Sequence, residues 1–348
     1  MPKEINDYMF SLIETLKSKG VAENTARNYV RNLYTLNNKK PFNSLAFLRH
    51  KNQILTALSP YADSTKRTFL ASICSVLDTV KTKRGYGKLL RDYQQILADL
   101  KKEDEEKPKN VRNEKQEANW IDWEDIQKIK NDLGDKVKDL AKRRQATTTE
   151  RNRLLEFFLL SLFTEIPPRR NQDYQLCYVV KKYRDGDKGM PKDRNYLSLD
   201  DNEFIFHRYK TAKKYGTQKV SFADNEPLKN AVRLYLKHHP LKPARYGKNT
   251  MYPLLVKPDG SPFSSVNGIT RLLHKIFKKK VGSSMLRHIY LTSKYGDKLD
   301  EMKEDSKKMG HSLKQQREYI KNGDDEEEEE KKGGGIEEVL AEIDNVGR

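Results

Sequence analysis

The sequence predicts a mainly α-helical protein of two domains with one small antiparallel β-sheet, an α+β fold. Three observations lead to this prediction. The chain has 348 residues, more than one compact core usually holds, and a highly charged stretch divides it at residues 101–118. Apolar residues recur at helical spacing on both sides of that stretch. Only residues 195–222 alternate apolar and polar side chains, as strands do.

Residues 1–100 are expected to form a small helical domain. Apolar side chains recur at helical spacing in residues 5–19, and Gly20 follows, where a helix C-terminus commonly needs a left-handed residue. A second helix is expected from Asn24, and a third from Ser64 as its N-cap. The outer faces of these two helices carry basic residues that either contact DNA phosphates or merely keep the surface soluble: Arg27, Arg31, Lys66 and Arg67.

The second domain is expected at residues 119–323, after a linker. Residues 101–118, KKEDEEKPKNVRNEKQEA, carry charges of both signs and few apolar side chains, which is typical of a solvated linker. Asp122 is placed as the N-cap of a new helix. Residues 154–163, LLEFFLLSLF, are apolar on nearly all sides and too short to cross a bilayer, so they predict a buried helix.

Within this domain, the spacing of apolar side chains changes from helical to alternating, and this change predicts the sheet. The runs NYLSL, EFIFHRY and YGTQKVSF alternate apolar and polar side chains, and the turn KTAKKYG precedes the third of them. We therefore expect three antiparallel strands. The run NQDYQLCYVV, residues 171–180, is predicted to be helical. His238 and His239 lie next to a proline without ligand partners at helical spacing and are expected at the surface.

Charge is the first functional signal. The chain has 68 basic and 50 acidic residues, a formal net charge of +18. Residues 324–348 hold eleven acidic and three basic residues, so the rest of the chain carries +26. A body that positive is expected to bind a polyanion, and double-stranded DNA or RNA fits better than a small acidic substrate.

The acidic segment 324–348 is expected to be a hinge followed by a short C-terminal helix. Its first part, DDEEEEEKKGGG, has the composition of disordered chain. Its second part places apolar residues on one helical stripe, and a lone helix of that length is marginal in water. It is therefore expected to dock on its own subunit or on a neighbouring one, unless it stays disordered.

No cofactor or metal is expected. Cys74 and Cys177 are the only cysteines, and neither has a CxxC or Cys/His spacing that could hold zinc. No run approaches the roughly 18 apolar residues of a membrane span, and the N-terminus lacks the apolar core of a signal peptide. We therefore expect a soluble, intracellular protein that acts at DNA.

Four short motifs carry the candidate chemistry. PPRRNQDY contains two adjacent arginines, RYKTAKKYG places a lysine in the turn of the sheet, GSSMLRHIYLT contains a third arginine, and MGHSLKQQREYI contains a tyrosine eight residues after a histidine. Each motif alone is weak, but their order and spacing together are specific. The candidate residues are Arg169, Arg170, Lys210, Ser284, Arg287, His311 and Tyr319.

In these motifs the chain resembles the tyrosine recombinase and integrase family. The resemblance covers both domains and implies a two-domain clamp around DNA, made of a helical core-binding domain and a catalytic domain. It also implies a homo-oligomer on DNA, from dimer to tetramer, with the C-terminal helix exchanged between protomers. The PPRR box and the LRHIYLT run are also similar to those of recombinases from eukaryotic mobile elements and large DNA viruses.

The resemblance implies a role for each residue. Tyr319 attacks a phosphodiester and keeps the bond energy as a phosphotyrosyl link, so that neither metal nor ATP is needed. Arg170 and Arg287 hold the phosphate oxygens, on which negative charge develops. Lys210 donates a proton to the leaving 5′ oxygen, and His311 donates a hydrogen bond to the phosphate.

Two assignments depart from a simple match. Arg170 is preferred as the first catalytic arginine because it has an R-x-x-acid spacing with Asp173, and Arg169 is the competing choice and is otherwise expected to contact DNA. Ser284 stands where the family usually has the first histidine of H-x-x-R, and serine cannot exchange a proton near neutral pH as imidazole does.

Other functions remain open at this point. A type IB topoisomerase or a hairpin-forming telomere resolvase would use the same nucleophile. A DNA-binding protein with weakened catalysis is conceivable because of Ser284, although the retention of the tyrosine, the arginines and the lysine argues against it.

Overall fold

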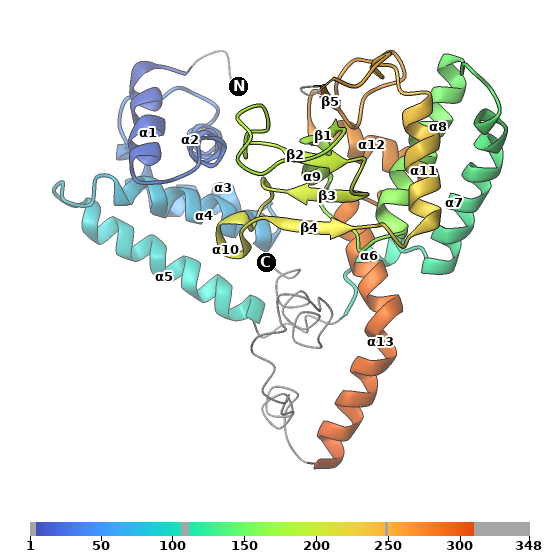
Figure 1. Cartoon of the computed structure of the whole chain (residues 1–348). Coiled ribbons are helices and arrows are strands. Elements are labelled where there is room, and N and C mark those ends of the chain that lie inside the picture. Colours follow the sequence, from blue (N-terminus) through green and yellow to red (C-terminus); the bar gives the residue numbers. More distant parts are fainter. Residues whose placement is uncertain (1–4, 106–110, 248–249, 310–348) are drawn as a thin grey trace, which may run out of the picture. The chain divides into compact units, whose positions relative to one another are not determined.

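A computed structural model describes residues 5–105, 111–247 and 250–309 of the chain (Figure 1). The chain consists of two compact units, Met1–Val111 and Arg112–Arg348. Among the described residues, no helix combines the length and the apolar character that crossing a bilayer requires.

The first unit is helical, with a core of its own. Its helices are α1 (Asp7–Ser18), α2 (Glu23–Leu36), α3 (Lys51–Leu58), α4 (Asp63–Asp78) and α5 (Tyr86–Glu105), with a 3₁₀ turn at Ala46–Arg49. The helices predicted from residue 5 and from Asn24 are confirmed as α1 and α2, and Gly20 has the expected positive φ of 86°. The predicted N-cap was wrong for α4, because Ala62 occupies that position and Ser64 lies inside the first turn.

The predicted linker is helical at both of its ends. Helix α5 continues to Glu105, and a short helix α6 spans Glu114–Asn119. A capping box starts α6: the side chain of Asn113 accepts a hydrogen bond from the Gln116 N–H, and the Gln116 side chain accepts one from the Asn113 N–H. Local capping therefore orders a segment whose charge composition resembles that of disordered chain.

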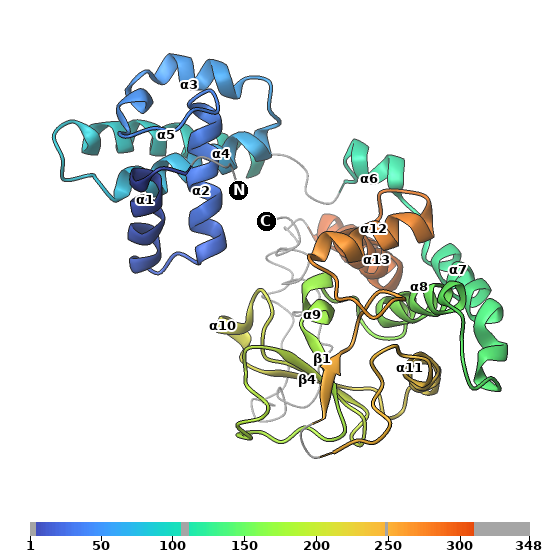
Figure 2. The same cartoon turned by 90° about the horizontal axis from the view of Figure 1, so that it is seen from above.

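The second unit is built around helix α8 (Thr148–Thr164), which buries ten of its side chains. The buried helix predicted at residues 154–163 is thus confirmed. Helix α7 (Trp123–Val137), with Asp122 as its N-cap, and helix α11 (Glu226–Lys237) both pack on it (Figure 2). The remaining helices of this unit are a 3₁₀ turn at Lys138–Ala141, α9 (Asn171–Gln175), α10 (Ala212–Tyr215), α12 (Val266–Phe277) and α13 (Ser283–Met309).

The sheet of the second unit has five strands in the order β4-β3-β2-β1-β5. The strands are β1 (Cys177–Val180), β2 (Asn195–Ser198), β3 (Glu203–Phe206), β4 (Gln218–Ser221) and β5 (Met251–Pro253). The three predicted strands are confirmed as β2, β3 and β4, and they pair antiparallel. The prediction of a purely antiparallel sheet was wrong, because β1 pairs parallel with β2 and makes the sheet mixed.

The helical prediction for residues 171–180 was only half right. Its first half forms α9, whereas its second half contains CYVV, which forms strand β1 between β2 and β5. Aromatic and β-branched side chains favour a strand, and the buried Cys177 and Val179 pack into the core between the sheet and the helices.

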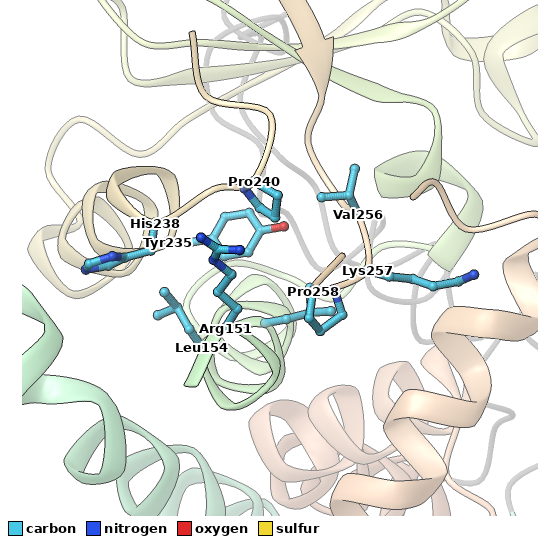
Figure 3. A pocket seen from close by; sticks show the side chains of 9 residues that line it. Arg151, Leu154, Tyr235, His238, Pro240, Val256, Lys257 and Pro258 are labelled. Carbon is cyan, nitrogen blue, oxygen red and sulfur yellow. The ribbon is translucent and has the colours of Figure 1, made fainter. Parts of the chain in front are cut away.

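The two histidines expected at the surface are buried, with 6% of His238 and 5% of His239 exposed. The Nε2 atom of His238 lies 2.8 Å from the carbonyl oxygen of Leu140, and that of His239 lies 3.1 Å from the carbonyl oxygen of Leu254. These carbonyls satisfy the imidazoles inside the core. His238 and Arg151 are among the residues that line a cavity of about 10 Å³ (Figure 3), a volume close to the minimum for one water molecule.

Candidate active site

Arg170 lies at the junction between helix α8 and helix α9. It is the N-cap residue of α9 in an extended conformation, with φ −75° and ψ 147°, and its carbonyl accepts a hydrogen bond from the Asp173 N–H at 3.0 Å. Its side chain is half-buried and makes no hydrogen bond or ion pair with any part of the chain that the structure describes. A half-buried guanidinium in this position can bind an anion without first breaking an ion pair.

Arg169 is held in a different way. Its Nε lies 3.1 Å from Oδ2 of Asp173, and the side chains of the two residues are only 17% and 3% exposed. Asp173, the acid of the R-x-x-acid spacing that favoured Arg170, therefore forms its ion pair with Arg169 and not with Arg170. The choice of Arg170 is favoured for another reason, because the guanidinium of Arg169 is occupied by protein groups and that of Arg170 is not.

Asp173 is a deeply buried carboxyl group beside two arginines. Burial raises the pKa of this carboxyl, and the charges of Arg169 and Arg170 and a hydrogen bond from Arg169 act in the opposite direction. Its second oxygen, Oδ1, is buried without a hydrogen-bond partner among the described residues. The two neighbouring arginines therefore stabilise a carboxylate that burial alone would disfavour.

The first turns of helix α13 bring in the second arginine motif. Leu286 and Ile289 are fully buried and anchor this end of the helix, while Arg287 between them is half-buried. The hydroxyl of Ser283 accepts a hydrogen bond of 3.3 Å from the backbone N–H of Asn171, the residue after Arg170. Because side chains four positions apart lie on the same helix face, Arg287 lies one turn beyond this contact.

Asn171 also fixes the start of helix α9 against helix α12. Its side-chain amide donates a hydrogen bond of 2.9 Å to the hydroxyl of Thr270. Asn171 is 6% exposed, and its Oδ1 is buried without a partner in the described ranges. The start of α9 is thus held by two helices that come roughly a hundred residues later in the chain.

Lys210 lies in the segment 207–217 that joins β3 to β4, here called the Lys210 turn. Its side chain is exposed, as are those of Lys213 and Lys214. The turn is closed by a hydrogen bond of 2.8 Å from the Tyr209 hydroxyl to the carbonyl oxygen of Gly216, which has a positive φ of 67°. The lysine expected in a turn of the sheet is therefore found in one.

Asn195 connects the Lys210 turn to helix α9. Its side-chain oxygen accepts hydrogen bonds from the N–H groups of His207 at 2.9 Å and Arg208 at 2.8 Å. Its amide donates to the carbonyl of Asp173 at 2.8 Å and to that of Arg208 at 3.0 Å. Asn195 is fully buried, and nothing in its sequence surroundings indicated this role.

The remaining candidates differ in what the structure says of them. Ser284 is exposed in the first turn of α13. His311 and Tyr319 lie outside the described residues, as does the predicted C-terminal helix. His288, which sequence reasoning passed over, lies one helical turn beyond Ser284. Burial and the charge of Arg287 lower the pKa of His288, so its imidazole is neutral at pH 7.

The basic residues of the first unit do not form an unopposed positive face. Arg27 donates a hydrogen bond of 2.8 Å to Glu23, and Lys66 lies 3.2 Å from Asp63. The hydrogen bond from Arg27, together with its charge, lowers the pKa of Glu23. Arg31 is exposed and Arg67 is half-buried.

Arg27 and Arg31 line one open hollow between helices α1 and α2. The hollow has a volume of about 340 Å³. Its other lining residues are both amides and apolar side chains: Ile5, Met9, Asn24, Asn28 and Val30.

Within the described ranges, no three His, Cys, Asp or Glu side chains are grouped so that they could hold a metal ion. The chain matches no protein-family model, no curated protein and no solved structure.

Proposed function

We propose that the chain is a site-specific DNA recombinase or integrase that cleaves and rejoins DNA strands through a covalent 3′-phosphotyrosyl intermediate. Tyr319 is its nucleophile, and double-stranded DNA is its substrate. The observation that carries the proposal is the hydrogen bond between Asn171 and Ser283. This contact brings together two arginine motifs that are far apart in the sequence.

The chemistry follows from the charges at this place. As the phenol oxygen of Tyr319 loses its proton to solvent and bonds to phosphorus, negative charge builds on the non-bridging oxygens. Two guanidiniums, those of Arg170 and Arg287, stabilise that charge by paired hydrogen bonds. The bond from phosphorus to the 5′ oxygen breaks, and Lys210 gives that oxygen its proton. Attack by a 5′ hydroxyl on the phosphotyrosine reverses these steps and reseals a strand.

The arrangement of the second unit supports these roles. The side chain of Arg170 makes no hydrogen bond or ion pair in the described part of the chain, which leaves its guanidinium available to a phosphate. Asn195 ties the Lys210 turn to the helix that Arg170 caps. Three cationic side chains from separate motifs thus lie on elements joined by hydrogen bonds, α13 to the start of α9 directly and the Lys210 turn to α9 through Asn195.

The test is capture of a covalent adduct. The full chain is incubated in EDTA with a pool of nicked duplexes that carry random central sequences, and DNA that stays attached after denaturation is recovered and sequenced. We expect the wild type and Tyr61→Phe, a change of an exposed tyrosine, to form the adduct, and Tyr319→Phe to bind DNA without forming it.

Three outcomes would count against the proposal. Adduct formation by Tyr319→Phe would refute the nucleophile assignment. The absence of any adduct with the wild type would leave only a DNA-binding protein. Relaxation of supercoiled DNA without exchange of strands between recovered sites would favour a type IB topoisomerase.

A further inference from the structure

We propose that Arg169 is a positioning residue that holds the Lys210 turn against the segment of Arg170. The inference rests on the proposed function, since it assigns Arg169 an effect on proton donation by Lys210. Arg169 itself is not proposed to touch DNA in this role, in contrast to its expected place among the DNA-binding residues.

The guanidinium of Arg169 contacts both ends of the Lys210 turn. Its NH1 group donates a hydrogen bond of 2.9 Å to Oε1 of Gln218, the first residue of β4. Its Cζ lies 3.8 Å from the ring centroid of Phe206, the last residue of β3, and 5.2 Å from that of Tyr209. The strand that enters the turn, the strand that leaves it and the neighbour of Lys210 thus all contact one side chain.

Arg169 also forms an ion pair with helix α9. The Nε group bonds to Oδ2 of Asp173, which lies one turn into the helix that Arg170 caps. Arg169 directly precedes Arg170 in the chain, and its side chain pairs with Asp173 of the helix that Arg170 caps. Both its backbone and its side chain are therefore fixed to the start of α9. A shift of the strand ends that hold the turn, relative to that segment, breaks the bond to Gln218 or the stacking on Phe206.

This role requires arginine and not merely a positive charge. The planar guanidinium donates to Asp173 and Gln218 in different directions while its face lies on an aromatic ring. A lysine at this position can keep the ion pair with Asp173, so the buried carboxylate is not left uncompensated. It cannot reproduce the planar fork, and the turn loses its fixed position.

The experiment compares two leaving groups in single-turnover cleavage by the full chain. The duplexes recovered by adduct capture are prepared with oxygen or with sulfur at the bridging 5′ position of the cleaved phosphate. A thiol has a pKa of about 8.5, far below that of an alcohol, so a thiolate leaves without a proton donor. The sulfur substrate therefore reports cleavage that does not depend on Lys210.

We expect Arg169→Lys to slow cleavage of the oxygen substrate on the order of 10²-fold, the effect of a misplacement of about 1 Å, and to cleave the sulfur substrate at nearly the wild-type rate. Gln218→Ala, which leaves the pair with Asp173 intact, should show the same pattern more weakly. Lys210→Ala should show it most strongly. Arg170→Ala should slow both substrates, because it acts on the phosphate itself.

Arg194→Lys is the matched control. Arg194 also pairs with an aspartate, Asp193 at 3.1 Å, and its Cζ lies 4.7 Å from the ring centroid of Tyr178. It contacts neither the Lys210 turn nor the Arg170 segment through these groups, so both substrates should be cleaved as by the wild type.

The ratio of the two rates separates positioning from stability. A partly unfolded variant loses activity on both substrates by the same factor, and only a displaced proton donor changes the ratio. If the wild type forms the adduct but Arg169→Lys slows cleavage of both substrates equally, the inference is overturned and the proposed function stays intact. A wild type without adduct would overturn the proposed function instead.

Discussion

The backbone N–H of Asn171 donates a hydrogen bond of 3.3 Å to the hydroxyl of Ser283, which lies 112 positions later in the chain. The contact joins the residue after Arg170 to the helix that carries Arg287. Because Asn171 is only 6% exposed, its N–H has little access to water if the hydroxyl is removed.

Ser283→Ala is therefore expected to lower the free energy of unfolding by about 1 kcal/mol, the net contribution of a typical hydrogen bond. It should also slow adduct formation, because the two arginines lose a shared anchor. Urea unfolding of the full chain and single-turnover cleavage measure the two effects. Ser293→Ala, an exposed position on the same helix, is the control. Equal stability of the two variants would show that the contact contributes nothing.

A second prediction concerns the salt dependence of DNA binding. Arg31 is exposed, and no ion pair involves it in the described part of the first unit, whereas Glu23 already offsets the charge of Arg27. Arg31→Gln should lower the slope of log affinity against log salt by about one, and Arg27→Gln should lower it less. Glu23→Gln should increase affinity. An equal decrease of the salt slope in Arg31→Gln and Arg27→Gln would contradict the effect assigned to Glu23.

A third prediction concerns stability against pH. Burial lowers the pKa of His239 from 6.5 to about 4, and its Nδ1 accepts a hydrogen bond from the Leu241 N–H, which suits the neutral ring. The unfolded chain therefore binds a proton at His239 at a higher pH than the folded chain does. The stability from the neutral imidazole is complete above pH 6.5 and is lost as the pH falls toward 4, by at most about 3 kcal/mol.

His239→Gln should remove this part of the pH dependence. The measurement is the free energy of unfolding of the full chain in urea between pH 4 and 7, a range set by the two pKa values. His50→Gln, at an exposed position, should keep the wild-type profile. An unchanged slope in His239→Gln would mean that other groups cause the acid sensitivity.

The sequence predicted those parts of the fold that have a local signal. Periodicity and capping were sufficient for α1, α2 and α8 and for the strands β2 to β4. Strand β1 is as long as β2 to β4, but its residues CYVV are all apolar or aromatic and do not alternate with polar ones, and a five-residue helix ends just before it. Strand β5 has only three residues, too few for a periodic pattern. The parallel pairing of β1 with β2 is a tertiary property, and no local pattern specifies it.

In the candidate site, too, the sequence predicted what has a local signal and missed the tertiary contacts. Motif spacing selected Arg170, Lys210 and Arg287, and the structure joins the element of Arg170 to that of Arg287 by one hydrogen bond and to that of Lys210 through Asn195. The spacing could not show which arginine pairs with Asp173, because an acid three residues after one arginine is four residues after the other, and the structure pairs it with Arg169. The contact of Arg169 with Gln218 spans 49 positions and gave no signal in the sequence.

The fourth prediction concerns Ser284, which stands where a histidine is usual in the family that the chain resembles. An exposed hydroxyl can donate a hydrogen bond to the phosphate or the phenol, but it cannot take the proton of Tyr319 near pH 7. Attack should therefore depend on hydroxide or on another base, and the cleavage rate should rise with pH above neutrality. His288 lies one turn further along the helix and its pKa is lowered, so its imidazole is the alternative to solvent as the proton acceptor.

Ser284→His introduces an imidazole at the usual position, so it should raise the cleavage rate near pH 7 and flatten the rise toward alkaline pH. His288→Gln should lower the rate near pH 7 and leave the rate at alkaline pH nearly unchanged, if His288 supplies the base in the wild type. Single-turnover cleavage across about pH 6 to 9 spans the titration of histidine and tests both variants against Ser284→Ala. Identical profiles for the wild type, Ser284→Ala and Ser284→His would mean that this position takes no part in proton transfer, because neither removing the hydroxyl nor adding a base changes the rate.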